Sequence, residues 1–233
     1  TSLIVLSAAN GETGVKSDIE GFAAVAKKHH IPLILDGVAL LGKERFLIPD
    51  GVMGMGFSSH KIHGPKGVGF AFIRKGFKVR PQLFGGGQEG SIRSGTENLP
   101  GILGLSCASS ILDKELEKAS THMKRLRDLL ESGLKKAFPD LLINGEGPRL
   151  PNTSNICFKG VDGEALLIHL DMMNISASHA SACSSGALEP SRVLLNMGLT
   201  KARASSSIRF SLSRMNTEEE ILKTIDLSLI HIS

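Results

Sequence analysis

A lysine that could do covalent chemistry follows two serines and a histidine at residues 58–61, Ser-Ser-His-Lys. An apolar run at 52–57 precedes this segment, and a second apolar run at 67–73 begins after a Gly-Pro pair. This pattern predicts two strands joined by a tight loop that carries Lys61. A lysine amine held in such a loop is suited to Schiff-base chemistry. A solvent-exposed lysine in an ordinary turn would give the same local pattern.

A carboxylate ends the preceding apolar run. Residues 32–35 are Pro-Leu-Ile-Leu, and Asp36 follows them, which is typical of a buried strand with an acid at its C-terminal edge. Ligands bind at this edge in open α/β sheets. Pyridoxal phosphate requires a carboxylate at its ring nitrogen and a lysine at its aldehyde. Because Ser58 and His60 add donors suited to a phosphate, the four residues favour a site for this cofactor.

The three cysteines differ in their surroundings. Cys183 lies in a stretch of small residues at 178–186, which is typical of an exposed loop in which a thiol can ionise and act as a nucleophile. Cys107 and Cys157 lie in apolar runs, so we expect both to be inert residues of the core.

Arg209 lies between Ile208 and Phe210 in a predicted strand. These neighbours indicate a largely buried guanidinium, which needs an anion. Its planar fork matches the α-carboxylate of an amino acid. A structural salt bridge is the alternative.

Motifs that follow one another along nearly the whole chain resemble the cysteine desulfurases, which are pyridoxal-phosphate enzymes of the class V aminotransferase-like group. They lie at residues 35–43, 58–67, 85–89, 93–96, 181–191 and 206–211. The resemblance implies the α/β fold of type I pyridoxal-phosphate-dependent transferases, as a partial large-domain sheet plus an α+β small domain. It also implies the removal of sulfur from L-cysteine, which yields alanine and a persulfide on Cys183.

The resemblance assigns a role to each candidate residue, and the spacing of the histidines and cysteines indicates no metal site. Thr96 would reach the phosphate of the partner subunit, which implies a homodimer with shared sites. The catalytic residues would be Lys61, His60 and Cys183; the cofactor-binding residues Asp36, Ser58, His60, Lys61 and Thr96; and the substrate-binding residues Arg209 and Asn10.

Three positions depart from the pattern of the family. Gly11 stands where the family has an Asn that touches the cofactor or substrate, and Ala39 stands where it has a Gln that contacts the phenolic oxygen of the cofactor. Ala180 replaces a Gly before Ser-Ala-Cys. Family members also carry a long segment before the position of Thr1, so we expect this chain to be a C-terminal portion.

Hydrophobic periodicity predicts the elements that must position these residues. In the first half we expect strands at 2–6 and 32–35, parallel to each other, and between them a helix to residue 28 that begins at a capping box, Ser17 to Glu20. A long amphipathic helix at 110–138 links two domains, 1–113 and 114–233. Strands at 155–159, 176–178 and 207–211, helices at 163–173 and 189–197, and a capping box from Thr217 to Glu220 complete the second domain.

Composition argues against other classes of partner. The 233 residues carry a formal net charge of only +4 and no Trp or Tyr, so a nucleic-acid surface has little support. No apolar run approaches membrane-spanning length. The widely spaced cysteines form neither a disulfide framework nor a metal cluster, so we expect a reducing, cytoplasmic setting. The expected partners are L-cysteine, a second subunit, and a sulfur acceptor or iron-sulfur scaffold protein.

Three other functions remain open. A selenocysteine lyase would use the same frame, and kinetics with both substrates would separate the two. A class V aminotransferase would need Lys61 and Asp36 but not Cys183. The third alternative is an inactive interaction subunit or a fragment.

Overall fold

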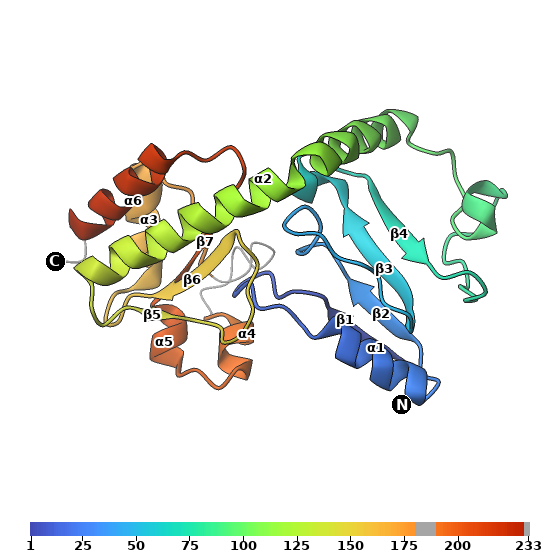
Figure 1. The fold of residues 1–233 in the computed structure, drawn as a ribbon, viewed down its shortest axis with the longest axis horizontal. Coiled ribbons are helices and arrows are strands. Elements are labelled where there is room, and N and C mark those ends of the chain that lie inside the picture. Colours follow the sequence, from blue (N-terminus) through green and yellow to red (C-terminus); the bar gives the residue numbers. More distant parts are fainter. Residues whose placement is uncertain (180–189, 231–233) are drawn as a thin grey trace. The chain divides into compact units, whose positions relative to one another are not determined.

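The computed structural model describes residues 1–179 and 190–230, which form two compact units (Figure 1). The first unit comprises Thr1–Ala8 and Asp18–Leu116, and the second comprises Ala9–Ser17 and Glu117–Ser233. The helix α2 (Leu99–Ala137) contributes to both units. Compact units do not by themselves define domains, so the division into 1–113 and 114–233 stays a prediction.

The first unit contains a four-stranded sheet in the order β1-β2-β3-β4. β1, β2 and β3 run parallel, and β4 pairs with β3 in the antiparallel direction. The parallel pairing of β1 with β2 confirms the arrangement expected from the strand-helix-strand order. The bounds are β1 (Ile4–Ser7), α1 (Ile19–Lys28), β2 (Leu33–Asp36), β3 (Val52–Ser58) and β4 (Gly69–Ile73).

The capping box predicted at the start of α1 is wrong in its first residue. Asp18, not Ser17, is the N-cap, because its side chain accepts a hydrogen bond from the main-chain nitrogen of Gly21 (2.9 Å). A carboxylate at this position satisfies an unpaired amide of the first turn and also interacts favourably with the helix dipole. The helix itself covers the predicted residues and buries Ala23 and Ala26.

The second unit contains a three-stranded antiparallel sheet in the order β5-β6-β7. Residues 176–178 do not form the expected strand; Ser178 makes only an isolated bridge with Arg209. The bounds are β5 (Leu142–Ile143), β6 (Thr153–Cys157), α3 (Gly163–Met172), α4 (Arg192–Asn196), α5 (Lys201–Ser205), β7 (Ser207–Ser211) and α6 (Glu218–Ile230).

The two faces of this second sheet differ in chemistry because side chains alternate along a strand. Ile156 of β6 pairs with Ile208 of β7, and both join an apolar core that α2, α3 and α6 complete. The next pair along the strands is Asn155 with Arg209, which belongs to the opposite, polar side. The apolar face therefore holds the second unit together, while the polar face carries a candidate functional residue.

Two helical predictions are confirmed. The stripe along α2 is buried at Leu116, Met123, Leu126, Leu130 and Leu134. At α6 the hydroxyl of Thr217 accepts from the Glu220 nitrogen (3.2 Å), and the Glu220 carboxylate accepts from the Thr217 nitrogen (2.9 Å). These reciprocal bonds are those of a capping box. Among the helices in the described part of the chain, none combines the length and apolarity needed to span a bilayer.

The burial predicted for Cys157 is confirmed, but the burial predicted for Cys107 is wrong. Cys157 in β6 is 2% exposed, whereas Cys107 is exposed on α2. The apolar run around Cys107 misled the prediction, because Ile102 and Leu103 of the same run are exposed as well. Burial raises the pKa of the Cys157 thiol, although a hydrogen bond with Ser207 and the charge of Arg203 partly oppose this effect.

We expect a maleimide reagent at neutral pH to modify Cys107 and to spare Cys157 in the folded protein, since a buried thiol with a raised pKa forms little thiolate. Peptide mapping by mass spectrometry assigns the modified residues, and the protein unfolded in urea serves as the control in which Cys157 reacts. Equal labelling of Cys107 and Cys157 in the folded protein would contradict the structure.

Candidate active site

Lys61 lies in a short 3₁₀ helix, η1 (Ser59–Ile62), that follows β3 directly. Ser59 and Ile62 at its two ends are buried, while His60 and Lys61 between them are exposed. Main-chain bonds close the turn: the Ser59 nitrogen donates to the Val68 carbonyl (3.1 Å), and the Gly64 nitrogen donates to the Ser59 carbonyl (3.0 Å). The predicted tight loop between two strands is confirmed, and its buried ends present the two exposed side chains.

Gly64 is needed for this turn. A Cβ atom at this position would lie 2.1 Å from the hydroxyl oxygen of Ser59, and Ser59 is completely buried. A larger residue would therefore force the Ser59 side chain, which begins the segment that carries Lys61, to move.

Asp36 ends β2, and its carboxylate is exposed at the same edge of the sheet as η1. In the pairing of β2 with β3, Asp36 is opposite Gly56, two residues before Ser58. One carboxylate oxygen accepts a hydrogen bond from the Val38 nitrogen (2.8 Å), which fixes the orientation of the side chain. The structure thus brings Asp36, Ser58, His60 and Lys61 to one edge, as expected for parallel strands.

This set of groups fits pyridoxal phosphate. The cofactor requires a carboxylate for its ring nitrogen, an amine for its aldehyde and donors for its phosphate. Asp36 supplies the carboxylate, Lys61 the amine, and Ser58 and His60 the donors. Asp36 and Lys61 are exposed, so a ligand can reach them.

Lys43 connects the turn after β2 to the turn after β3. Residues 37–43 form a turn in which the Leu40 and Leu41 nitrogens donate to the Gly37 carbonyl. At the end of this turn, the Lys43 ammonium donates to the main-chain carbonyl of Lys61 (Nζ to O, 3.3 Å). Burial lowers the pKa of Lys43, and repulsion from the positive charge of Lys61 lowers it further. The sequence contained Lys43 only as one letter of a motif and did not indicate this contact.

Thr96 is exposed in the loop between the 3₁₀ helix η2 (Gln88–Ser91) and α2. Together with residues of β4 and the first turns of α2 it lines a cavity of about 650 Å³. Its predicted role at the phosphate of a partner subunit stays a prediction. Cys183 lies outside the described residues.

Arg209 and Asn10 belong to the second unit. Arg209 is half-buried, which is less than the sequence suggested. One terminal nitrogen of its guanidinium donates to the main-chain carbonyl of Gly11 (3.0 Å), and the other donates to the hydroxyl of Ser178 (3.1 Å). Sequence reasoning missed both partners, and no local pattern marks either one.

Asn10 organises the loop of residues 9–17 from within. Its side-chain oxygen accepts from the main-chain nitrogens of Glu12 and Thr13, both at 2.9 Å, and from the hydroxyl of Thr13 at 3.2 Å. An Asn side chain that accepts hydrogen bonds from the main-chain nitrogens two and three residues later is typical of a turn, so the Asn in the sequence is a local signal for this turn.

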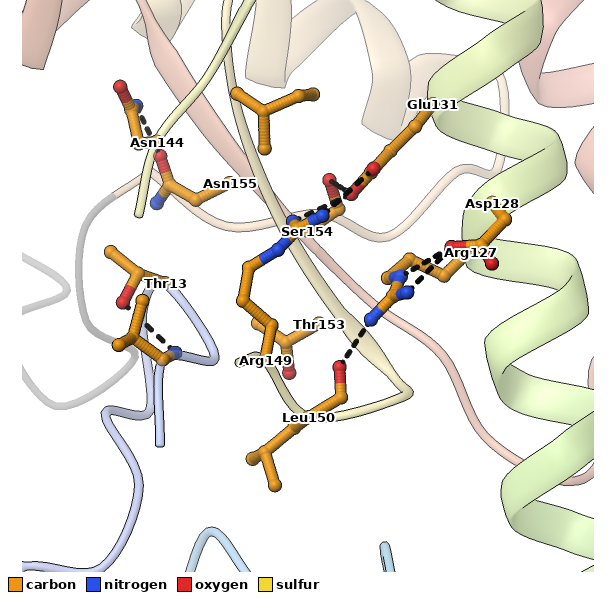
Figure 2. A network of polar contacts seen from close by, with 12 residues as sticks. Thr13, Arg127, Asp128, Glu131, Asn144, Arg149, Leu150, Thr153, Ser154 and Asn155 are labelled. Atoms are coloured by element: carbon orange, nitrogen blue, oxygen red, sulfur yellow. Dashed lines mark hydrogen bonds and ion pairs between the residues drawn. The ribbon is translucent and has the colours of Figure 1, made fainter. Parts of the chain in front are cut away.

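A network of polar contacts fixes this loop within the second unit (Figure 2). Asn155 donates to the main-chain carbonyl of Glu12 (3.3 Å) and accepts from the buried side chain of Asn144 (2.6 Å). The loop also pairs with residues 148–150, since the Leu150 nitrogen donates to the Gly14 carbonyl (2.8 Å). Close approach requires Gly14, because a Cβ atom there would lie 2.9 Å from Thr153.

The segment that pairs with the loop is itself attached to α2. Figure 2 shows Arg149 extended toward Glu131, and its two terminal nitrogens donate to the two carboxylate oxygens at 2.8 and 3.0 Å. Ser154 donates to the same carboxylate (2.7 Å). This bidentate pair is mostly buried, which favours a single geometry. The loop is therefore held by both β6 and α2.

The lowered pKa of Lys43 predicts that the stability of the protein depends on pH. Its folded-state pKa lies below the ordinary value of 10.5, so in the window between the two values the unfolded chain binds the proton more strongly. The free energy of unfolding then rises with pH through that window. Below the window Lys43 is charged in both states, and the folded protein bears the full cost of holding that charge. We expect the free energy of unfolding of the wild type, relative to Lys43→Met, to increase as pH approaches 10.5.

Urea unfolding at a series of alkaline pH values measures this difference. Lys66→Met is the matched control for the loss of one lysine, because Lys66 is exposed in the same region. A difference for Lys43→Met that falls or does not change with pH would contradict a lowered pKa of Lys43.

Comparison with known proteins shows which family of sequences this chain resembles. A cysteine desulfurase of Nostoc sp. is 43% identical over 229 residues, which are 97% of this chain and 57% of that protein. The cysteine desulfurase NifS of Azotobacter vinelandii is 42% identical over 219 residues, or 93% of this chain and 54% of that protein. The chain thus spans somewhat more than half the length of the curated relatives it matches.

Solved structures confirm the predicted fold. A NifS-like protein aligns with a TM-score of 0.88 at 37% identity, over 98% of this chain and 60% of the other. The NifS-like protein of Rickettsia africae aligns with a TM-score of 0.85 at 35% identity, over 97% and 60%. The family described as aminotransferase class-V matches residues 1–223. With the Lys61 turn and Asp36 at one sheet edge, this match establishes that the chain belongs to the aminotransferase class-V family.

Proposed function

We propose that this protein is a pyridoxal-phosphate-dependent cysteine desulfurase, which converts L-cysteine into alanine and leaves the sulfur as a persulfide on Cys183. One observation carries the proposal: the exposed Lys61 on η1 and the exposed carboxylate of Asp36 lie at the ends of paired parallel strands. The relatives of Nostoc and Azotobacter that share this sequence are named cysteine desulfurases.

Four residues of the first unit would hold the cofactor. Asp36 would accept a hydrogen bond from the protonated ring nitrogen, and its own bond from the Val38 nitrogen already orients the carboxylate. Ser58 and His60 would donate to the phosphate. Lys61 would take the aldehyde.

When bound, pyridoxal phosphate supplies a ring that accepts the electron pair left by loss of the Cα proton of an amino acid. Asp36 keeps the proton on the ring nitrogen. The Lys61 amine removes the Cα proton from L-cysteine.

Cys183 would carry out the sulfur transfer. Its thiolate forms a bond to the sulfur of the substrate while the bond between that sulfur and Cβ breaks, and the carbon then takes a proton. L-cysteine and the enzyme thiol together become alanine and the enzyme persulfide, so atoms and electrons balance. This role comes from the motif around Cys183 and from the loop composition that favours an ionised thiol.

Arg209 and Asn10 are the proposed substrate contacts. A guanidinium with two terminal nitrogens can bind an α-carboxylate through parallel hydrogen bonds. Gly11, beside Asn10, replaces an Asn of the related desulfurases. A Cβ atom at Gly11 would meet nothing within 4 Å, so the main chain does not require glycine there. The replacement at Gly11 therefore removes a side-chain contact without a steric reason, and Ala39 in place of Gln removes a second contact.

The proposed assembly is a homodimer in the cytoplasm, in which Thr96 contacts the cofactor phosphate of the partner subunit. The persulfide would pass to a sulfur acceptor or an iron-sulfur scaffold protein. The exposure of Thr96 beside a cavity supports a role for its loop in contacts with another chain.

Replacement of Lys61 tests the proposed function. We expect borohydride reduction of full-length protein loaded with pyridoxal phosphate to attach the cofactor to Lys61, and Lys61→Ala to abolish the attachment, because this amine alone joins the aldehyde. Peptide mapping after reduction measures it. Lys66→Ala, which removes another exposed lysine of the same loop, should keep full labelling. Attachment at Lys43 or Lys66 in the wild type would refute the assignment.

A further inference from the structure

Two neutral groups hold the guanidinium of Arg209. The hydroxyl of Ser178 and the main-chain carbonyl of Gly11 each accept a hydrogen bond from a different terminal nitrogen, at 3.1 and 3.0 Å. Neither acceptor carries a charge, so these two contacts orient the guanidinium by hydrogen bonding alone. They use two of the five N–H groups of an arginine side chain.

The main chain fixes Ser178 beside Arg209. The Ser178 nitrogen donates to the Arg209 carbonyl (3.0 Å), and the Arg209 nitrogen donates to the Ser178 carbonyl (2.7 Å). This reciprocal pair gives Ser178 a constant position relative to β7. Its hydroxyl therefore has a fixed place from which to meet the Arg209 side chain.

The Gly11 carbonyl is fixed from the other direction. The Asn10 side chain closes the turn in which Gly11 lies, through its bonds from the Glu12 and Thr13 nitrogens. Asn155 holds the next residue of the turn by donating to the Glu12 carbonyl. Asn155 also pairs with Arg209 across β6 and β7. The two acceptors thus belong to the same rigid set of contacts as the arginine that they orient.

We propose that Ser178 is a positioning residue, whose hydroxyl acts with the Gly11 carbonyl to hold Arg209 in the orientation that binds the α-carboxylate of the substrate. The inference rests on the proposed function, in which Arg209 binds that carboxylate. A free arginine side chain would have to be ordered when the substrate binds, and ordering lowers affinity. Ser178 orders the Arg209 side chain before the substrate binds. Its loss should therefore weaken substrate binding and leave cofactor binding unchanged.

The test compares L-cysteine with its methyl ester, which lacks the negative charge that Arg209 recognises. In full-length protein loaded with pyridoxal phosphate, we expect Ser178→Ala to raise KM for L-cysteine by about 3- to 10-fold, the effect of one hydrogen bond, with kcat nearly unchanged. The ratio of kcat/KM for the acid to kcat/KM for the ester should fall by the same factor. Affinity for L-alanine, which has the carboxylate but no sulfur, should fall in parallel.

Three further variants make the comparison specific. Ser178→Thr keeps the hydroxyl and should restore the preference for the acid. Ser176→Ala is the matched control, since Ser176 is exposed two residues away, and it should behave as the wild type. Arg209→Lys loses the planar fork and should reduce the preference for the acid at least as strongly as Ser178→Ala.

The outcomes separate the inference from the proposed function. If Arg209→Lys loses the preference for the acid but Ser178→Ala keeps it, the positioning role is wrong and the role of Arg209 stands. If Ser178→Ala weakens acid and ester equally, the hydroxyl is merely structural and the inference fails. If the wild type releases alanine but treats acid and ester alike, Arg209 does not recognise the carboxylate, and the inference fails while the proposed function stands. If the wild type does not release alanine from L-cysteine, the proposed function fails and the inference fails with it.

Discussion

The parallel pairing of β2 with β3 is the constraint on which the candidate site depends. Each strand is four to seven residues long, yet their register places Asp36 opposite Gly56, so both strands end at the same edge. The chain then turns within η1, because Ser59 and Ile62 are buried and leave His60 and Lys61 exposed between them. A slip of one residue would turn each side chain to the opposite face. Register, more than any single contact, determines which functional groups meet.

In the second unit, side chains alternate along β7, so that residues of the apolar core and the proposed binding residue lie on opposite faces. Ile208 and Phe210 belong to the apolar core, while Arg209 between them lies on the polar side with Asn155. The loop of residues 9–17 covers part of that side and supplies the Gly11 carbonyl to Arg209. Arg149 and Glu131 secure the neighbouring segment to α2. The loop follows β1 in sequence but belongs by its contacts to the second unit.

Local patterns predicted most elements and the residues of the Lys61 turn, because apolar runs, a Gly-Pro pair and capping residues report directly on nearby structure. Contacts between distant segments left no such signal: Gly11 and Arg209 are 198 residues apart, and Lys43 meets a main-chain carbonyl 18 residues away. β5 has only two residues, too few to show alternation. Cys107 was misplaced because an apolar run cannot indicate that part of a helix face is exposed.

The most direct test of the central claim is the mass of the Cys183 peptide after full-length protein, loaded with pyridoxal phosphate, reacts with L-cysteine in the absence of a reductant or sulfur acceptor. The proposed chemistry predicts one added sulfur atom on this peptide and the release of one alanine for each persulfide formed. Sulfur on Cys107 in its place, or alanine release that continues undiminished in Cys183→Ser, would contradict the proposed role of Cys183 as the residue that accepts the sulfur.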